Sequence, residues 1–313
     1  MSASILSELS RSHQVALTTL AATDREYCDR LQNSLVRGSH ELLYWGVGPP
    51  LRRGDIVALY MPKTKFLPDS EHSRVRRLYF AAADSTPGSS WNQHVFLNRR
   101  VDLDPAITYQ DLIETIGLSF RHVMAAGRMS APLAESVSAR LLSVASKRCA
   151  GGLAEFRLRA QQAKAIPKVC ISYSGQDWTQ AQRLKLWLDA AGLAPFFVSP
   201  AGGVLPVEEE PLRDLLISTF SSTSVVICLV PETLALSKWI QLEVSAALVH
   251  AKRLILVRTD EKRPWPIHSR RKNVYRYTLR PTREHDLVGK VKQELAALAV
   301  QQQRAADGAA RRR

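Results

Sequence analysis

The sequence lacks a long hydrophobic segment. None of its apolar runs approaches the roughly 18 to 20 residues that are needed to cross a bilayer, and the N-terminus has no basic stretch followed by an apolar one. These absences argue against a membrane-spanning helix and against a secretory signal peptide. We therefore expect a cytoplasmic protein without a membrane partner.

Cysteine is also scarce. No pair of cysteines shows CxxC spacing, and none has histidine neighbours at metal-ligand spacing, so we predict no metal site and no redox motif. Two of them lie inside apolar, strand-like runs, which favours reduced core residues over disulfides. The four cysteines are Cys28, Cys149, Cys170 and Cys228.

Acidic residues are fewer than basic ones. The chain has 29 Asp and Glu against 43 Lys and Arg, which gives a net charge of +14. An excess of this size suits an anionic partner. It equally describes a generally basic surface without a dedicated polyanion site, and since both halves share the excess, charge does not single out one of them.

The length of 313 residues exceeds that of a usual single domain, so we expect two domains. The changes of pattern along the chain predict a β-rich domain with helices at 1–150 and a helical or flexible connector at 151–167. An α/β domain follows at 168–300. The last segment, 301–313, is expected to be a basic disordered tail.

The first domain begins with helical spacing of apolar residues, at Leu6, Leu9, Val15 and Leu20. From Leu42 the pattern changes to short apolar runs separated by Pro, Gly and Ser clusters, which predict strands. These runs are LLYWGV, GDIVALYM, RLYFAAAD and HVFLNRRVDL. After Pro105 the helical period returns, through YQDLIETIGLSF and PLAESVSARLLSVASKR.

From Lys168 strand-like runs alternate with amphipathic helices. Strands that are apolar on both faces and alternate with helices indicate an open parallel sheet. In such sheets ligands bind beyond the carboxyl ends of the strands. The residues that follow the first three strands should therefore line one crevice. The predicted strands are VCISYS, PFFV, VVICLV, RLILVRTD and NVYRYTL.

The segment WIQLE places one acidic side chain, Glu243, on the flank of an otherwise apolar helix after VVICLV. Positions four apart share a helix face, so Trp239 and Glu243 lie together beside the apolar stripe. This carboxylate is the best candidate for chemistry in the chain. The alternative is a solvated glutamate on an amphipathic helix, which is the usual state of a helical Glu.

In this order and spacing, the region from about Lys168 to Ala299 resembles a TIR (Toll/interleukin-1 receptor) domain of the NAD-cleaving type. The marks are VCISYSGQD, GLAPFFV with its long following loop, the serine-rich entry to VVICLV, and SKWIQLEVSAAL. The resemblance implies a flavodoxin-like parallel sheet, and either an NAD-cleaving enzyme or a signalling scaffold that assembles into homo-oligomers through its TIR domains.

In the enzymes of this family the catalytic glutamate lies four residues after the tryptophan of the third helix, which corresponds to Glu243. NAD would be its substrate, and no cofactor is expected. Breaking the ribose–nicotinamide bond leaves positive charge on the sugar, which a fixed carboxylate stabilises. Nicotinamide leaves as a neutral molecule and needs no general acid. An ordinary pKa near 4.3 would keep this carboxylate ionised at neutral pH.

The resemblance also implies a substrate pocket around Glu243. Trp239 would stack on a base or fill the core. The glycine pair would allow close approach of a phosphate, or would simply make a turn. The residues expected to bind the substrate are Tyr173, Ser174, Asp177, Phe197, Gly202, Gly203 and Trp239.

The segment from Leu42 to Ile113 resembles an EVE domain of the PUA-like class, through YWGV, LRRGDIVALYM, RRLYFAAAD, Trp91 and VDLDPAITYQDL. The resemblance implies a small α+β domain with a β-barrel that binds a modified nucleotide or nucleic acid by stacking. Its candidate residues are Trp91, Tyr60, Tyr79, Arg52 and Arg53. The alternative is that the aromatic residues pack the barrel and the arginines are solvated.

Together these expectations describe a TIR effector that cleaves NAD to nicotinamide and ADP-ribose, or a cyclic product. The N-terminal domain would sense a ligand and control it, in antiviral defence. One alternative is a non-enzymatic TIR scaffold. Another is a nucleic-acid binder in which the TIR fold only dimerises.

Overall fold

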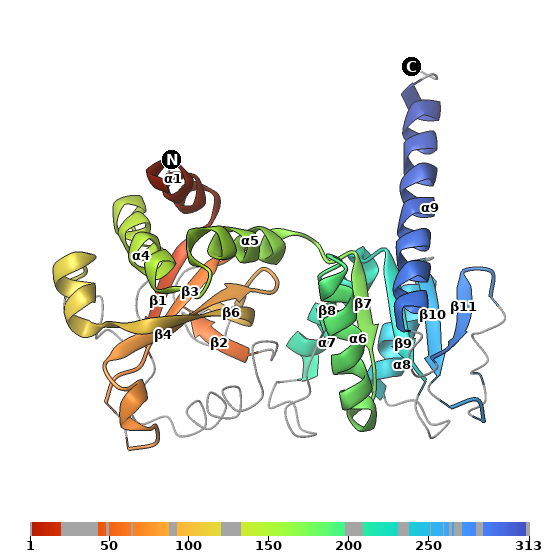
Figure 1. The fold of residues 1–313 in the computed structure, drawn as a ribbon, viewed down its shortest axis with the longest axis horizontal. Coiled ribbons are helices and arrows are strands. Elements are labelled where there is room, and N and C mark those ends of the chain that lie inside the picture. The colour runs from red at the N-terminus through yellow and green to blue at the C-terminus, as the bar shows by residue number, and fades with distance from the viewer. Residues whose placement is uncertain are drawn as a thin grey trace. The chain divides into compact units, whose positions relative to one another are not determined.

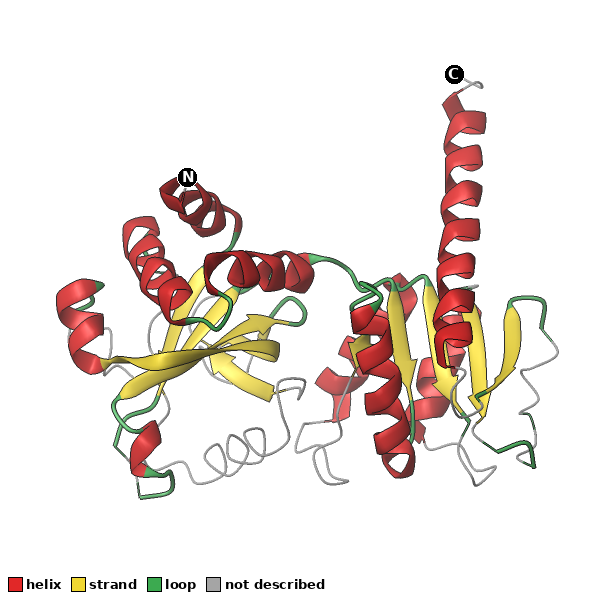
Figure 2. Cartoon of the chain, in the orientation of Figure 1, coloured by secondary structure: helices red, strands yellow, loops and turns green. Residues whose placement is uncertain are grey.

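The computed structural model contains two compact units, Met1–Ala165 and a second that begins at Ile166 (Figure 1). Each unit has its own sheet (Figure 2) and its own core. The structure describes residues 2–19, 43–47, 50–63, 65–87, 93–119, 133–197, 209–230, 238–250, 252–258, 260–262, 265, 271–279 and 284–310.

The first unit is built on a mixed sheet in the order β1-β3-β4-β6-β2, with β5 paired to β6. The pair β1–β3 is parallel and the other pairs are antiparallel. The strands are β1 (Val15–Thr19), β2 (Leu43–Val47), β3 (Ile56–Tyr60), β4 (Arg74–Ala81), β5 (Thr86–Pro87) and β6 (Gln93–Thr108). Within the described residues the path runs from β1 to β2 without closing, so a complete barrel stays a prediction.

Helices cover one face of this sheet. They are α1 (Ser2–Ser12), α4 (Glu135–Arg148) and α5 (Gly152–Lys164). The unit also has the short helices η1 (Asp69–Glu71) and η2 (Asp111–Thr115), and Leu112 of η2 packs in the same core. Alternate strand residues such as Ala58 and Phe80 pack under the helices, whereas Val57 and Ala81 belong to a second apolar cluster on the other face. The period of two along each strand produces this division.

Two segments of the first unit differ from the sequence prediction. The helical spacing at the N-terminus ends at Ser12, and Val15–Thr19 is a strand. All five residues of this strand are buried, so it shows no alternation that would separate it from a helix. The stretch 151–167 is mostly helix α5, as one of its two predicted alternatives has it, but this helix buries Phe156, Ala160 and Ala163 in the core of the first unit and does not merely connect.

The second unit has a parallel sheet in the order β11-β10-β9-β7-β8. Its strands are β7 (Val169–Ser172), β8 (Phe196–Phe197), β9 (Val225–Leu229), β10 (Arg253–Arg258) and β11 (Val274–Thr278), all at predicted positions. The α/β class and the open parallel sheet are therefore confirmed. The helical elements are η3 (Gly175–Asp177), α6 (Trp178–Ala190), α7 (Glu209–Ser222), α8 (Lys238–Val249) and α9 (Glu284–Ala310).

Different helices pack on the two faces of the parallel sheet. Leu184 and Leu188 of α6, with Leu287 and Val291 of α9, pack on one face against the core that includes Ile227. Helix α8 lies against β7, β9 and β10 on the other face and packs on α7. Figure 1 shows α6 and α9 in front of the sheet, with α7 and α8 behind it.

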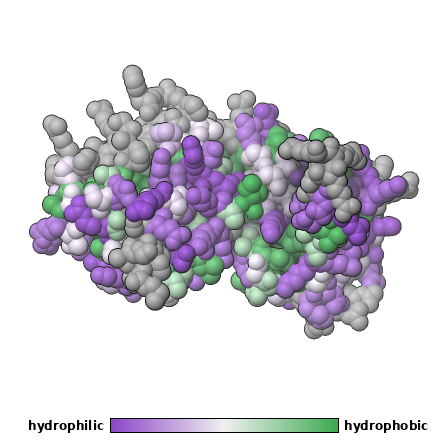
Figure 3. Space-filling model, turned by 90° about the horizontal axis from the view of Figure 1, so that it is seen from above, coloured by the Kyte–Doolittle hydropathy of each residue, from purple (hydrophilic) through white to green (hydrophobic). Residues whose placement is uncertain are grey.

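Helix α9 continues to Ala310 and extends past the ends of the strands (Figure 1). The prediction of disorder for 301–313 is therefore wrong for 301–310, because the Gln- and Ala-rich sequence QQQRAADGAA prolongs a helix that already has a buried base. In the part of the chain that the structure describes, no helix is both long enough and apolar enough to span a membrane. Hydrophilic residues cover much of the face in Figure 3, as the charge of +14 suggests.

Replacing Phe156 tests whether α5 belongs to the core of the first unit. Phe156 is fully buried, so Phe156→Ala should lower the free energy of unfolding by about 3–5 kcal/mol. Leu158 on the same helix is 48% exposed, and Leu158→Ala should cost less than about 1 kcal/mol. Urea denaturation of the full-length protein measures both. Equal effects would mean that α5 is a connector after all.

Candidate functional site

The candidate carboxylate, Glu243, lies on α8 against the carboxyl end of β7. It is only 8% exposed, and the Ser172 hydroxyl donates a hydrogen bond to its Oε2 atom. Ser172 is the last residue of β7 and pairs in register with Cys228 on β9. Glu243, Ser172 and Cys228 therefore form one buried polar group between α8 and the two central strands.

Burial changes the protonation of this group. Loss of solvent raises the pKa of Glu243 to about 8, although the hydrogen bond from Ser172 opposes the shift. The pKa of Cys228 rises to about 12, first because of burial and then because of the nearby Glu243. The expectation of a carboxylate ionised at neutral pH is therefore wrong for this state of the protein, because the helix flank that carries Glu243 is covered and not open to water.

The predicted substrate residues near β7 form a second group. Tyr173 stacks on Phe197 with ring centroids 5.0 Å apart and an interplanar angle of 11°, and Trp178 lies 5.3 Å from Phe197. Tyr173 and Phe197 pack with the core on the α6 side of the sheet, whereas Ser172 faces α8. The aromatic group and Glu243 thus sit on opposite faces, at the same carboxyl edge.

Tyr173 still lies within electrostatic reach of Glu243. Burial raises the pKa of Tyr173 well above its usual range, and the charge of Glu243 raises it further. Behind it, the Ser174 hydroxyl donates to Asp177 Oδ2 at 2.6 Å, and Asp177 is buried at the start of α6. Ser174 and Asp177 therefore brace the turn that carries Tyr173.

Several predicted residues lie outside the described part of the structure. These are Gly202, Gly203, Trp91 and the side chain of Trp239, although the backbone of Trp239 belongs to α8. Their roles stay predictions. Conversely, the sequence analysis missed Ser172, Cys228 and Trp178. The sequence feature that could have pointed to Ser172 is a polar residue inside the apolar strand VCIS, two positions after Cys170 and therefore on the same face of the sheet.

The structure separates the two described tyrosines of the first unit. Tyr60 is buried in the cluster under the helices, and Tyr79 is buried in the cluster on the opposite face of the sheet. Each is 3% exposed. The two rings therefore do not share one surface, because successive residues along a strand point to opposite faces of the sheet. Their role in stacking on a base stays a prediction.

The turn that contains Arg52 and Arg53 is held by carboxylates. The Arg52 amide donates to Asp55 Oδ2 at 2.7 Å, and the Arg53 amide donates to Asp84 Oδ1 at 2.9 Å. The side chain of Arg52 is exposed. The two acids offset part of the positive charge that the sequence places here.

No metal site appears among the residues that the structure describes, where no group of three or more His, Cys, Asp or Glu side chains converges. Three cysteines, Cys149, Cys170 and Cys228, are buried free thiols, as predicted. Cys28 lies outside the described residues.

Comparison with known proteins identifies the second unit. Residues 169–291 match the family model described as TIR domain. The second unit contains a TIR domain. The resemblance seen in the sequence is confirmed to this extent, and the parallel sheet agrees with the TIR fold.

No curated protein matches the chain. Among solved structures, one similar chain is described as "Structure of Clostridium botulinum CMP N-glycosidase, BcmB". It is 13% identical, covers 40% of this chain and 98% of its own length, and superposes with a TM-score of 0.29.

Replacing Glu243 by glutamine tests its burial through stability. The pKa is about 8 in the folded protein and 4.5 for an ordinary glutamate. Between these values the folded protein holds a proton that the unfolded chain has lost, so the free energy of unfolding falls as pH rises from 4.5 to 8. Glu243→Gln should remove this fall, which amounts to a few kcal/mol.

The measurement is urea denaturation at several pH values between 4.5 and 9. Glu261→Gln, a change at an exposed position of the same unit, serves as the control and should follow the wild-type curve. Parallel curves for Glu243→Gln and wild type would show that the Glu243 pKa is not raised.

Proposed function

We propose that the TIR domain cleaves the bond between nicotinamide and ribose in NAD, with Glu243 as the catalytic residue. The observation that supports this proposal is a buried carboxyl group with a strongly raised pKa at the carboxyl edge of an open parallel sheet. Ligands of such sheets bind at this edge, and strongly shifted pKa values concentrate at functional sites.

The chemistry fits the environment of Glu243. When the bond breaks, the positive charge of the nicotinamide ring passes to the ribose, so a nearby anion stabilises the transition state. Burial makes this attraction stronger than it would be in water. The same burial keeps Glu243 protonated in the absence of a cation, so the positively charged substrate would itself favour the ionised form.

Release of nicotinamide tests the assignment. Full-length wild-type protein, incubated with NAD at high protein concentration, should release nicotinamide, and Glu243→Gln should lower the rate by at least about a hundredfold. The control Glu261→Gln should keep the wild-type rate. Comparable release by Glu243→Gln and wild type would refute the role of Glu243.

The pH dependence gives a second test. Only the ionised carboxylate stabilises the sugar cation, so kcat/KM should rise with pH and level off above an apparent pKa near 8, which belongs to the free enzyme. The profile of kcat should be shifted to lower pH, because the cationic substrate favours ionisation. A kcat/KM that is constant between pH 6 and 9 would contradict the mechanism.

A non-enzymatic scaffold is the second candidate. The observation in its favour is that the Glu243 carboxyl is already satisfied inside the protein, by Ser172. As a scaffold the protein would release no nicotinamide in any assembly state, and Glu243→Gln would self-associate like the wild type. TIR domains commonly self-associate, so assembly alone does not separate the two functions.

We further propose that the first unit controls the TIR domain by binding a nucleotide or nucleic acid, in a defence response. The net charge of +14 and the exposed Arg52 support an anionic ligand. With Tyr60 and Tyr79 on opposite faces, at most one of them stacks on a given base. The EVE-like character of this unit remains part of the proposal.

A further inference from the structure

The TIR domain has a cavity of about 330 Å³ beside its edge strand, between β11 and α9. The strands supply Ile255, Tyr275, Arg276 and Tyr277, and α9 supplies Asp286, Lys290 and Gln293. Two aromatic rings thus face a row of polar side chains. A volume near 300 Å³ is at the lower end of ligand pockets, which suits a molecule of mononucleotide size.

The cavity is separate from the candidate catalytic group. It lies on the face of the sheet that α9 covers, whereas Glu243 lies on the face covered by α8. In the order β11-β10-β9-β7, three strand spacings separate β11 from Ser172, which is about 14 Å. A small ligand in the cavity would not reach Glu243.

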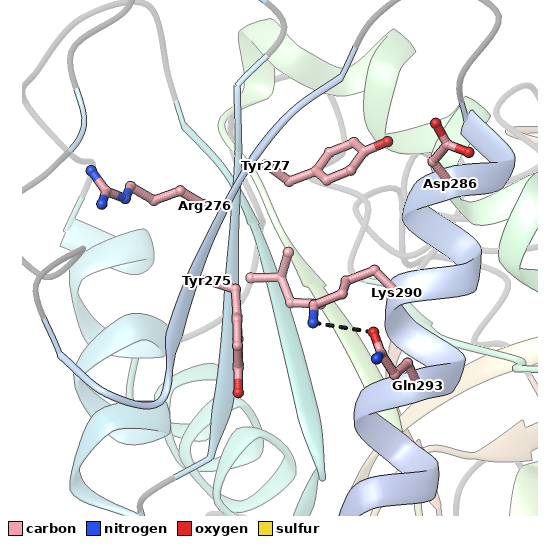
Figure 4. Close-up of a pocket in the computed structure, with 7 residues that line it drawn as sticks. Tyr275, Arg276, Tyr277, Asp286, Lys290 and Gln293 are labelled. Atoms are coloured by element: carbon pink, nitrogen blue, oxygen red, sulfur yellow. Dashed lines mark hydrogen bonds between the residues drawn. The ribbon is translucent and has the colours of Figure 1, made fainter.

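Figure 4 shows how the side chains are arranged. Tyr277 extends toward Asp286, and Lys290 lies across from Tyr275, with its Nζ atom 4.7 Å from the ring centroid. The side chain of Arg276 leaves β11 on the other side, as alternation along a strand requires. Tyr277 therefore offers aromatic surface to the cavity, Lys290 lies over the ring of Tyr275, and α9 offers the polar groups.

The charges near Lys290 favour an anion. Lys290 pairs with Glu294 at 2.8 Å, and Arg253 lies 3.6 Å from the same carboxylate. Glu294 is only 5% exposed, so one buried negative charge is shared by two cations. The cluster Arg253–Glu294–Lys290 keeps one net positive charge, and the carboxylate of Asp286 lies at the other end of the cavity, beside Tyr277. Lys290 also donates to Gln293 Oε1 at 3.3 Å, which holds its ammonium beside the cavity.

We propose that this cavity binds a nucleoside monophosphate. The base would rest against the ring of Tyr277, since base–aromatic stacking tolerates different bases. The phosphate would bind Lys290, and the amide of Gln293 would contact polar groups of the ligand. The site is additional to the proposed cleavage of NAD and does not depend on it.

Isothermal titration calorimetry of the full-length protein with AMP tests the proposal. AMP should bind, whereas adenosine, which lacks the phosphate, and ribose 5-phosphate, which lacks the base, should each bind at least about tenfold more weakly. Glu243→Gln should bind AMP like the wild type, since Glu243 lies on the other face.

Variants assign the binding to this cavity. Lys290→Gln should weaken AMP binding by about tenfold and leave adenosine unchanged, whereas Lys290→Arg, which keeps the charge and the pair with Glu294, should bind like the wild type. Tyr277→Leu should weaken AMP and adenosine alike, and Tyr277→Phe should restore both. Lys292→Gln, at an exposed position of α9, is the matched control.

Two results would overturn the proposal. One is the absence of AMP binding to the wild type at millimolar concentration. The other is AMP binding that Lys290→Gln and Tyr277→Leu leave unchanged, with thermal melting curves showing that both variants are folded. That outcome would place the nucleotide elsewhere on the protein.

Discussion

The chemistry proposed for the TIR domain depends on one contact, the hydrogen bond from Ser172 to the buried carboxyl of Glu243. A carboxylate out of water is costly unless a cation or several hydrogen bonds stabilise it. Here a single hydroxyl stabilises the ionised form only in part, so the pKa of Glu243 is raised to about 8. The group is therefore held neutral until a positive charge approaches. In the proposed reaction, a cationic nicotinamide ring would supply that charge and would also be the group that is released.

The parallel sheet places the buried acid and the aromatic group, two elements of the proposed site, on opposite faces. Ser172 and Cys228 face α8 and carry the acid, whereas Tyr173 and Phe197 turn to the α6 side and form an aromatic surface at the same edge. Further along that second face, β11 and α9 line an open cavity bordered by Lys290. One alternation of residues along the strands thus produces a candidate catalytic group and a distinct candidate binding site.

The sequence predicts the parallel sheet well, because fully apolar strands alternate with helices at clear intervals. It fails where local pattern and burial disagree. All residues of Val15–Thr19 are buried, so this strand has no alternation of buried and exposed positions. In α5 the buried residues Phe156, Ala160 and Ala163 are separated by charged and polar ones, so the sequence does not mark a core helix. At the site, the position of Glu243 four residues after Trp239 is enough to mark it as the candidate catalytic residue. The protonation state of Glu243 cannot be predicted from the sequence, because it depends on Ser172, 71 residues away in the chain, and on how completely α8 is buried.

The most direct test of this account is the pKa of Glu243 itself. Carbon-13 labelling of glutamate side chains, with Glu243→Gln to assign the resonance, allows the carboxyl to be titrated by NMR in the absence of substrate. The account predicts a midpoint near 8, and a higher one in Ser172→Ala, since the hydroxyl lowers the pKa. A midpoint near 4.5 in the wild type would show that the carboxyl is solvated, and would contradict the claim that burial holds it neutral until a cation arrives.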